Sequence, residues 1–233
     1  MSSLLVLTAG GHGQVVAETA QYLGFSPIDF LDDGKVIGTR VGGNPGVGAV
    51  VGRLQDMESM LGAGQDDMEL RPEQGQDDAE RRPEQGQDGM ELRPEQGQDD
   101  AERRPEQGQD DTERLPERGR YEMVFPALGN NSVRHMWYQE HAGHKLRIPT
   151  LIHPTAWVSP SAQLGAGVIV EAMAVINANA VVGEGTIIGI GCMIDHDARI
   201  GCCAHLDAGS IVHARGVVPD ATKVEAGTVV GEG

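Results

Sequence analysis

The sequence predicts an α/β domain at the N-terminus followed by a parallel β-helix. Three observations lead to this fold class. A strand, glycine turn, helix and strand open the chain, an acidic 11-residue repeat interrupts it, and an aliphatic residue then recurs every six positions. We therefore assign residues 1–63 and 120–149 to a Rossmann-like domain, 64–119 to an insert, and 150–233 to a left-handed β-helix of hexapeptide repeats.

The N-terminal domain is predicted from alternating apolar runs and a glycine-rich turn. In chain order, its expected elements are the strand Leu4–Leu7, the turn Thr8–Gly13, the helix Gln14–Leu23, the strand Ile28–Leu31, the strand Tyr121–Leu128, the helix Asn131–His141 and the short strand Lys145–Ile148. This β–α–β order indicates a small parallel sheet covered by helices.

The insert consists of five copies of an 11-residue unit such as GQDDAERRPEQ. Each copy contains Pro and Gly and at most two apolar residues. Such a segment buries too little apolar surface to offset the entropy of ordering, so we expect residues 64–119 to be disordered.

The β-helix is predicted from fourteen hexads in one register. Each begins with Ile, Leu or Val, at Ile152, Val158, Leu164, Val170, Ile176, Val182, Ile188, Ile194, Ile200, Leu206, Val212, Val218, Val224 and Val230. A six-residue period fits neither an α-helix nor a flat strand. It fits a prism with one short strand per hexad, three hexads per coil and the aliphatic side chains inside.

Small residues support the same prism. In nearly every hexad a small residue lies four positions after the aliphatic one, as at Ala156, Ala174 and Ser210. We expect the corners, where a Cβ would clash, to be formed by Gly165, Gly167, Gly183, Gly185, Gly201 and Gly227.

Composition excludes several functions. The net charge is −17, but residues 64–119 carry 19 acidic and 8 basic residues, so the rest of the chain has a net charge of only −6. This balance argues against a nucleic-acid partner, and no apolar stretch is long enough for a membrane span. Ser2–Leu7 is predicted to be a buried strand and not a signal peptide, and three cysteines without metal-ligand spacing favour the cytoplasm and no metal.

Three motifs follow predicted strands of the α/β domain, where ligands bind in open parallel sheets. Gly10-Gly11-His12-Gly13 would let a phosphate approach the first N–H groups of a helix, although it could equally be an ordinary tight turn. Two further motifs occupy equivalent places. The first is Asp32-Asp33, which could instead be a pair of solvated loop acids. The second is Gly129-Asn130-Asn131 with Arg134, in which Asn131 could be only a helix cap.

The fourth motif, Asp195-His196-Asp197, lies inside the hexads. A histidine between carboxylates is an oriented base of raised basicity, whereas a lone histidine on a turn would be a surface residue. His205 follows nine residues later, which is half of an 18-residue coil. The two histidines should therefore lie on different faces of one protomer and meet only across a neighbouring protomer, as in a trimer.

In their chain order these motifs resemble a known family. Gly11-His12-Gly13, Phe30-Leu31-Asp32-Asp33, Ala127-Leu128-Gly129-Asn130-Asn131, Leu151-Ile152-His153-Pro154 and Asp195-His196-Asp197 with His205 are similar to the bacterial sugar O/N-acyltransferases of the sialic acid O-acetyltransferase group. Within this group the chain resembles the UDP-amino-sugar N-acetyltransferases of the bacillosamine pathway. They carry Glu where this chain has Asp195 and Asp197.

The resemblance implies a cytoplasmic homotrimer that transfers an acetyl group from acetyl-CoA to the amine of a nucleotide-activated sugar, of UDP-4-amino-sugar type, for surface glycan synthesis. It implies His196 as the general base, Asp197 as the acid that raises its basicity, and His205 as an acetyl-CoA contact from the adjacent subunit. The residues implied in nucleotide-sugar binding are Gly10, Gly11, His12, Asp32, Asp33 and Gly129.

Three alternatives remain open at this point. The same machinery could O-acetylate sialic acid or another glycan hydroxyl. His196, His205 and His213 could hold zinc at a trimer interface, as in a γ-type carbonic anhydrase. A binding scaffold without catalysis is the third, and it would follow if the end of the β-helix at Gly233 left no groove for CoA.

Overall fold

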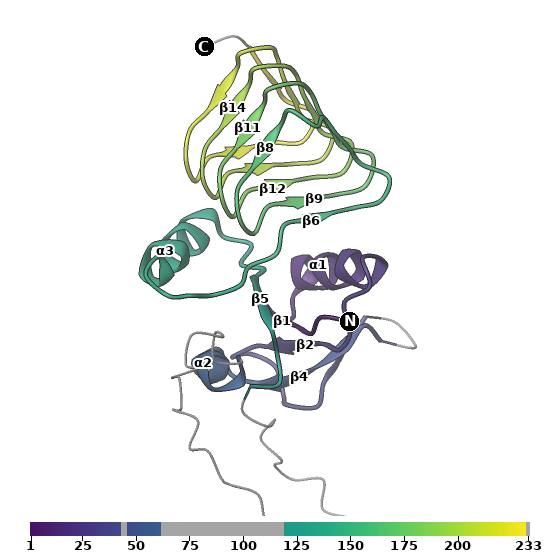
Figure 1. The fold of residues 1–233 in the computed structure, drawn as a ribbon, viewed down its shortest axis with the longest axis vertical. Helices are drawn as coiled ribbons and strands as arrows, with labels where there is room; N and C mark the ends of the chain where they lie inside the picture. Colours follow the sequence, from purple (N-terminus) through teal and green to yellow (C-terminus); the bar gives the residue numbers. More distant parts are fainter. Residues whose placement is uncertain (43–45, 62–118, 232–233) are drawn as a thin grey trace, which may run out of the picture. The chain divides into compact units, whose positions relative to one another are not determined.

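The computed structural model describes residues 1–42, 46–61 and 119–231. Within them it confirms the predicted fold class, with a parallel α/β sheet at the N-terminus and a parallel β-helix at the C-terminus (Figure 1). The insert expected at 64–119 lies outside the described residues except for Gly119. Its predicted disorder therefore stays a prediction.

The N-terminal sheet has the strand order β3-β4-β2-β1-β5. Its strands are β1 (Leu4–Leu7), β2 (Ile28–Leu31), β3 (Arg40–Val41), β4 (Gly48–Gly52) and β5 (Met123–Pro126). All neighbours pair in parallel except β3 and β4. Strands β1 and β2 are buried along their whole length, as expected for a parallel sheet covered on both faces.

Helices and turns cover this sheet on both faces. The elements are α1 (Gly11–Tyr22), the 3-10 helix η1 (Leu54–Asp56), α2 (Met57–Met60) and α3 (Asn131–His141). Residues of α1 share a core with Leu4 and Val6, whereas Met57 and Met60 of α2 pack with Leu5 and Leu7. The alternating side chains of β1 thus divide between two cores.

The predicted boundaries need four corrections. The helix α1 begins at Gly11 and not at Gln14, because the glycines of the turn form its first residues. The strand expected at Tyr121–Leu128 is limited to Met123–Pro126. No strand forms at Lys145–Ile148, where Arg147 O accepts one backbone hydrogen bond, from Val124 N at 3.1 Å. The short strands β3 and β4 were not predicted, because their sequence lacks a clear apolar alternation.

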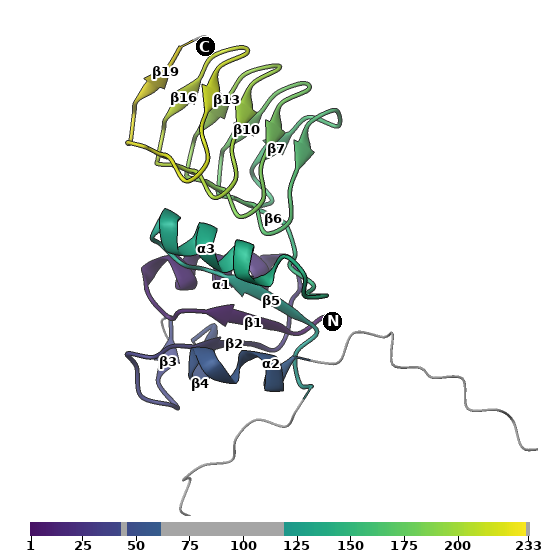
Figure 2. The same cartoon turned by 90° about the vertical axis from the view of Figure 1, so that its left-hand side faces the viewer.

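The β-helix contains fourteen two-residue strands among the described residues, arranged as three parallel sheets (Figure 2). They are β6 (Leu151–Ile152), β7 (Trp157–Val158), β8 (Gln163–Leu164), β9 (Ile169–Val170), β10 (Val175–Ile176), β11 (Val181–Val182), β12 (Ile187–Ile188), β13 (Met193–Ile194), β14 (Arg199–Ile200), β15 (His205–Leu206), β16 (Ile211–Val212), β17 (Val217–Val218), β18 (Lys223–Val224) and β19 (Val229–Val230). The second residue of every strand is the predicted aliphatic, and these side chains form one core cluster with the small residues. Each residue pairs with the one 18 positions later, such as Ile176 with Ile194.

The three sheets differ in what their outward side chains contact. The sheet β18-β15-β12-β9-β6 turns Leu151, Ile169 and Ile187 into the core that contains Leu4 and α1 residues, so it faces the α/β domain. The sheet β19-β16-β13-β10-β7 turns a column of apolar side chains outward, and four of the five are exposed. The column consists of Trp157, Val175, Met193, Ile211 and Val229.

Helix α3 packs along one corner of the β-helix. Asn131, Arg134 and Tyr138 share a face of the helix, since they are three and four residues apart. Asn131 donates to Ala221 O at 3.3 Å, and Arg134 donates to Gly185 O at 2.7 Å. The Tyr138 ring lies so close to Gly185 that a Cβ there would be 2.5 Å from Cε2.

This packing predicts unequal costs for two glycine substitutions with the same backbone conformation. Gly185 and Gly191 both have φ +65°, but a Cβ at Gly191 would meet nothing within 4 Å. We expect Gly191→Ala to lower the free energy of unfolding by about 1 kcal/mol, from left-handed strain alone. Gly185→Ala should cost about 3 kcal/mol, because the methyl group also displaces Tyr138. Denaturant unfolding of both variants measures the difference, and equal losses would show that the close approach of Tyr138 is unimportant.

Candidate active site

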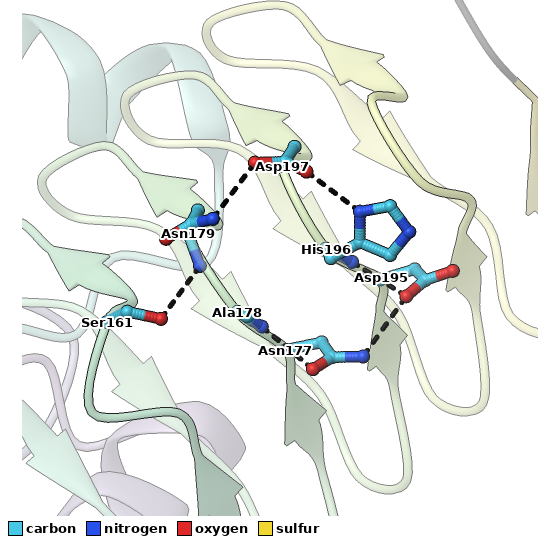
Figure 3. Close-up of polar contacts among 7 residues, drawn as sticks. All are labelled: Ser161, Asn177, Ala178, Asn179, Asp195, His196 and Asp197. Carbon is cyan, nitrogen blue, oxygen red and sulfur yellow. Dashed lines mark hydrogen bonds and ion pairs between the residues drawn. The ribbon is translucent and has the colours of Figure 1, made fainter.

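The Asp195-His196-Asp197 motif forms the corner between β13 and β14 (Figure 3). His196 Nδ1 lies 2.8 Å from Asp197 Oδ2. Because an ionised carboxylate only accepts hydrogen bonds, Nδ1 carries the proton and Nε2 is left with its lone pair. Asp197 has φ +59°, a left-handed conformation that turns its carboxylate back to the imidazole. The corner therefore presents an oriented base.

Two asparagines on the preceding coil of the β-helix hold the carboxylates of Asp195 and Asp197 in place. Asn179 Nδ2 donates to Asp197 Oδ1 at 3.2 Å, and Asn177 Nδ2 donates to Asp195 Oδ1 at 3.1 Å. Ser161 Oγ in turn accepts from Asn179 N at 3.1 Å (Figure 3). No sequence motif marks these residues, but Ser161, Asn179 and Asp197 follow one another at intervals of 18 residues, the length of one coil, and this spacing is a signal that could have found them.

Hydrogen bonding shifts the pKa values of this corner in opposite directions. The hydrogen bond with Asp197 raises the pKa of His196, against a smaller effect of desolvation, and the charge of Asp195 adds to the rise. Hydrogen bonds from His196 and Asn179 lower the pKa of Asp197. The pair is therefore a basic imidazole beside a stable carboxylate, as general-base catalysis requires.

His205 lies on a different face of the β-helix from His196, as expected. It is the outward residue of β15, in line with Ile187, and thus faces the α/β domain. Burial lowers the pKa of His205, the charge of Asp207 opposes the shift, and the charges of Arg134 and Lys223 lower it further. His205 is therefore a half-buried imidazole that favours the neutral form.

His12 lies in the first turn of α1, and its electrostatic neighbours are Arg134 and His205. Burial, followed by the charges of Arg134 and His205, lowers the pKa of His12 to about 4. Its Nε2 atom is buried and has no hydrogen-bond partner among the described residues. Neutral His12 thus has an unused polar atom beside His205.

The glycines around His12 leave room for a ligand. A Cβ at Gly10, Gly11 or Gly129 would meet nothing within 4 Å. No side chain caps the N-terminus of α1 at Gly10, and its first turn contains no acidic residue. Free N–H groups and the positive end of the helix dipole therefore remain available to an anion such as phosphate.

Asp32 and Asp33 hold the loops at the same edge of the sheet. Asp32 accepts from Ala9 N and Gly34 N, each at 2.8 Å, and Asp33 Oδ1 accepts from Leu54 N at 3.0 Å. Burial acts to raise the pKa of Asp32, but these amide hydrogen bonds outweigh it and lower the pKa. Both carboxylates thus already bind backbone amides, a role that the motif did not reveal.

Two residues that sequence reasoning did not place complete this edge. Arg53, which no motif singled out, donates to Asp32 O at 3.2 Å and to Asp33 O, and so pins the loop after β2. Asn130, rather than Asn131, caps α3, since its Oδ1 accepts from Val133 N at 3.1 Å. The structure brings Gly10, Gly11, His12, Asp32, Asp33 and Gly129 to the carboxyl ends of neighbouring strands β1, β2 and β5, while His196 lies apart on its own corner.

Comparisons with known proteins agree with the fold. The family model for the PglD N-terminal domain matches residues 3–62. The acetyltransferase domain of PglB from Neisseria gonorrhoeae FA1090 is 25% identical and has a TM-score of 0.65, with 100% of this chain and 87% of that chain covered. The same domain in complex with acetyl coenzyme A has a TM-score of 0.51 at 25% identity, with coverage of 98% and 92%.

A further solved structure shares the fold. PerB from Caulobacter crescentus, in complex with CoA and GDP-perosamine, is 22% identical and has a TM-score of 0.54, with 100% of this chain and 84% of that chain covered. A comparison with curated proteins gave no match. The matches confirm the predicted resemblance to bacterial sugar N-acyltransferases, and they support acetyl-CoA-dependent acetyl transfer.

Two other properties of the described residues bear on the earlier expectations. No helix among residues 1–42, 46–61 and 119–231 is long and apolar enough to cross a membrane. In the same part of the chain, no three His, Cys, Asp or Glu side chains are grouped so that they could hold a metal ion.

Asn177 and Asn179, which donate to the two carboxylates of the corner, give a test with a matched control. Asn179→Ala removes the side chain that donates to Asp197. We expect kcat/KM of acetyl transfer to fall about tenfold, which is the usual effect of one hydrogen bond to a charged group. Asn177→Ala removes the equivalent donor from Asp195, which is not bonded to the imidazole, and should change kcat/KM far less. Similar losses in the two variants, measured by steady-state kinetics, would mean that Asn179 only supports the coil.

Proposed function

We propose that this protein is a cytoplasmic acetyltransferase that transfers the acetyl group of acetyl-CoA to the amine of a nucleotide-activated 4-amino-sugar, with a UDP-sugar as the expected substrate. The observation that carries the proposal is the His196–Asp197 pair, whose 2.8 Å contact leaves Nε2 free to accept a proton. The 25% identity to a PglB acetyltransferase domain over the whole chain supports the same reaction class. The cytoplasmic location follows because acetyl-CoA and nucleotide-sugars are made there.

The proposed reaction is a direct transfer. The sugar amine attacks the thioester carbonyl carbon, and a C–N bond forms while His196 Nε2 accepts a proton from the nitrogen. The C–S bond then breaks, and the leaving CoA thiolate receives that proton from His196. Asp197 stabilises the imidazolium between these steps, and no covalent acyl-enzyme is needed because the amine is already a competent nucleophile.

The nucleotide-sugar is proposed to bind at the carboxyl edge of the N-terminal sheet. The uncapped start of α1 at Gly10 and Gly11, with the unpartnered His12 Nε2, offers donors to a diphosphate. Gly129 lies at the end of a strand adjacent to β1, and Asp32 and Asp33 hold the loop on the other side. His205, which lies beside His12, is proposed to contact the acetyl-CoA.

The proposal requires a neighbouring copy of the chain. His196 and His205 lie on different faces of one protomer, so one copy does not bring the base to the nucleotide-sugar edge. The apolar column that includes Val175, Met193 and Trp157, the last 51% exposed, lies on the sheet next to the His196 corner. A homotrimer that buries this column would bring His196 of one copy to His12 and His205 of the next.

A thiol-release assay tests the proposed function. Acetyl-CoA is incubated with UDP- and GDP-linked 4-amino-sugars, their N-acetylated forms and sialic acids, and free CoA is measured together with the mass of the sugar product. A GDP-sugar is included because PerB, which shares the fold, was solved with GDP-perosamine. Transfer to an amine supports the proposal, whereas transfer only to sialic acid would move the function to O-acetylation.

The pH profile tests the base. His196→Ala should lower kcat/KM by about 10²–10⁴-fold, the usual contribution of a general base. The raised pKa of His196 means that the neutral base is lost as the pH falls, so the wild-type profile should rise through a pKa higher than that of an ordinary histidine. Asp197→Asn removes the charge that favours imidazolium, and its rising limb should move to lower pH with a smaller loss of rate. A profile unmoved by Asp197→Asn would contradict this assignment.

Mixing two inactive variants tests the shared site. His196→Ala and His205→Ala proteins are mixed, unfolded and refolded together, then assayed at low acetyl-CoA. If each site takes His196 from one copy and His205 from the next, some mixed trimers contain a site with both histidines intact. In an equal mixture, random assembly should restore about one quarter of the wild-type sites. Failure to regain activity in trimers of confirmed mixed composition would show that both histidines act within one protomer.

A further inference from the structure

Arg134 has no part in the reaction described above, yet it is the largest fully buried side chain among the described residues, 1% exposed. Its guanidinium donates to main-chain carbonyls and to one side-chain amide. The acceptors are Gly185 O at 2.7 Å, Leu128 O at 2.6 Å, Cys203 O at 2.8 Å, Ala204 O at 3.2 Å and Asn131 Oδ1 at 2.9 Å. No carboxylate of the described residues pairs with it. The charge is therefore buried without a counterion.

These acceptors belong to the two segments that carry the proposed binding residues. Leu128 directly precedes Gly129, in the turn between β5 and α3. Ala204 directly precedes His205, on a coil of the β-helix. A guanidinium is a rigid planar group whose donors have fixed directions, so bonds to both segments fix their separation and angle together. Arg134 is thus the direct polar link between the Gly129 turn and His205.

The charge of Arg134 also acts on His12 and His205, which are both half-buried. It is the second cause, after burial, of the lowered pKa of His12, and it contributes to the lowered pKa of His205. The other charged groups around His205 are Asp207 and Glu225, which raise its pKa, and Lys223, which lowers it.

We propose that Arg134 is a positioning residue of the transfer reaction, which sets the spacing between the nucleotide-sugar bound at the Gly129 turn and the acetyl group at His205. The inference rests on the proposed function for its kinetic consequence. The effect of the Arg134 charge on the pKa of His205 does not depend on the proposed function.

Two substitutions separate the geometry from the charge. Arg134→Lys keeps the charge but loses the planar fork, and Arg134→Gln loses both. Arg40→Gln is the control, since Arg40 is an exposed residue of β3. Circular dichroism and size exclusion first establish the folded fraction, and all rates are expressed per folded molecule.

The readouts are the pKa values of His12 and His205 from NMR titration, and kcat and KM for each substrate. We expect Arg134→Gln to raise both histidine pKa values and to lower kcat about 100-fold, the size of loss that follows from a displacement of about 1 Å in a reacting group. Arg134→Lys should leave both pKa values low and still lower kcat. Arg40→Gln should match the wild type in every readout.

The outcomes are distinguishable from failure of the proposed function. If the wild type transfers acetyl to no sugar in the panel, the proposed function is wrong, and the histidine titrations still decide whether Arg134 controls His205. Wild-type kcat and KM per folded molecule, with unshifted histidine pKa values, would overturn the inference and leave Arg134 a structural residue. If Arg134→Gln does not fold, Arg134→Lys carries the test, and a wild-type kcat in that variant would overturn the positioning role.

Discussion

The arrangement of the proposed site depends on the contact between α3 and one corner of the β-helix. Arg134 and Tyr138 lie on the same face of α3, and both pack against Gly185, where a side chain would not fit. The buried guanidinium binds main-chain carbonyls of both parts of the chain. Because main-chain atoms move together with their segment, this contact determines where the proposed nucleotide-binding edge lies relative to His205.

The 18-residue coil has a second consequence, because it stacks equivalent corners directly on one another. Ser161, Asn179 and Asp197 follow at this interval and are joined by hydrogen bonds along the corner. The proposed catalytic corner is therefore supported by side chains at the equivalent positions of the preceding coils. The supporting residues lie far from the motif in sequence but at a fixed multiple of the repeat.

The surroundings of three histidines shift their pKa values in different directions. His12 and His205 are half-buried and feel the charge of Arg134, and partial burial lowers the pKa of each. His196 is exposed on a corner and bonded to Asp197, which raises its pKa. Neutral imidazoles suit binding of a ligand through hydrogen bonds, whereas a basic imidazole suits removal of a proton. The difference comes from desolvation in two cases and from a carboxylate neighbour in the third.

The sequence by itself determined the β-helix, because a strict six-residue repeat of aliphatic residues is a local pattern that only one coil geometry satisfies. It also determined the order of β1, α1 and β2, and the neighbourhood of His196 with Asp197, since these contacts join residues adjacent in the chain. Tertiary structure alone decided that Arg134 connects Leu128 with Cys203 and Ala204, and that the charge of His205 acts on His12. It also decided that Lys145–Ile148 forms no strand. These outcomes rest on packing between segments up to almost 200 residues apart, such as His12 and His205, and no local spacing encodes which surfaces will meet.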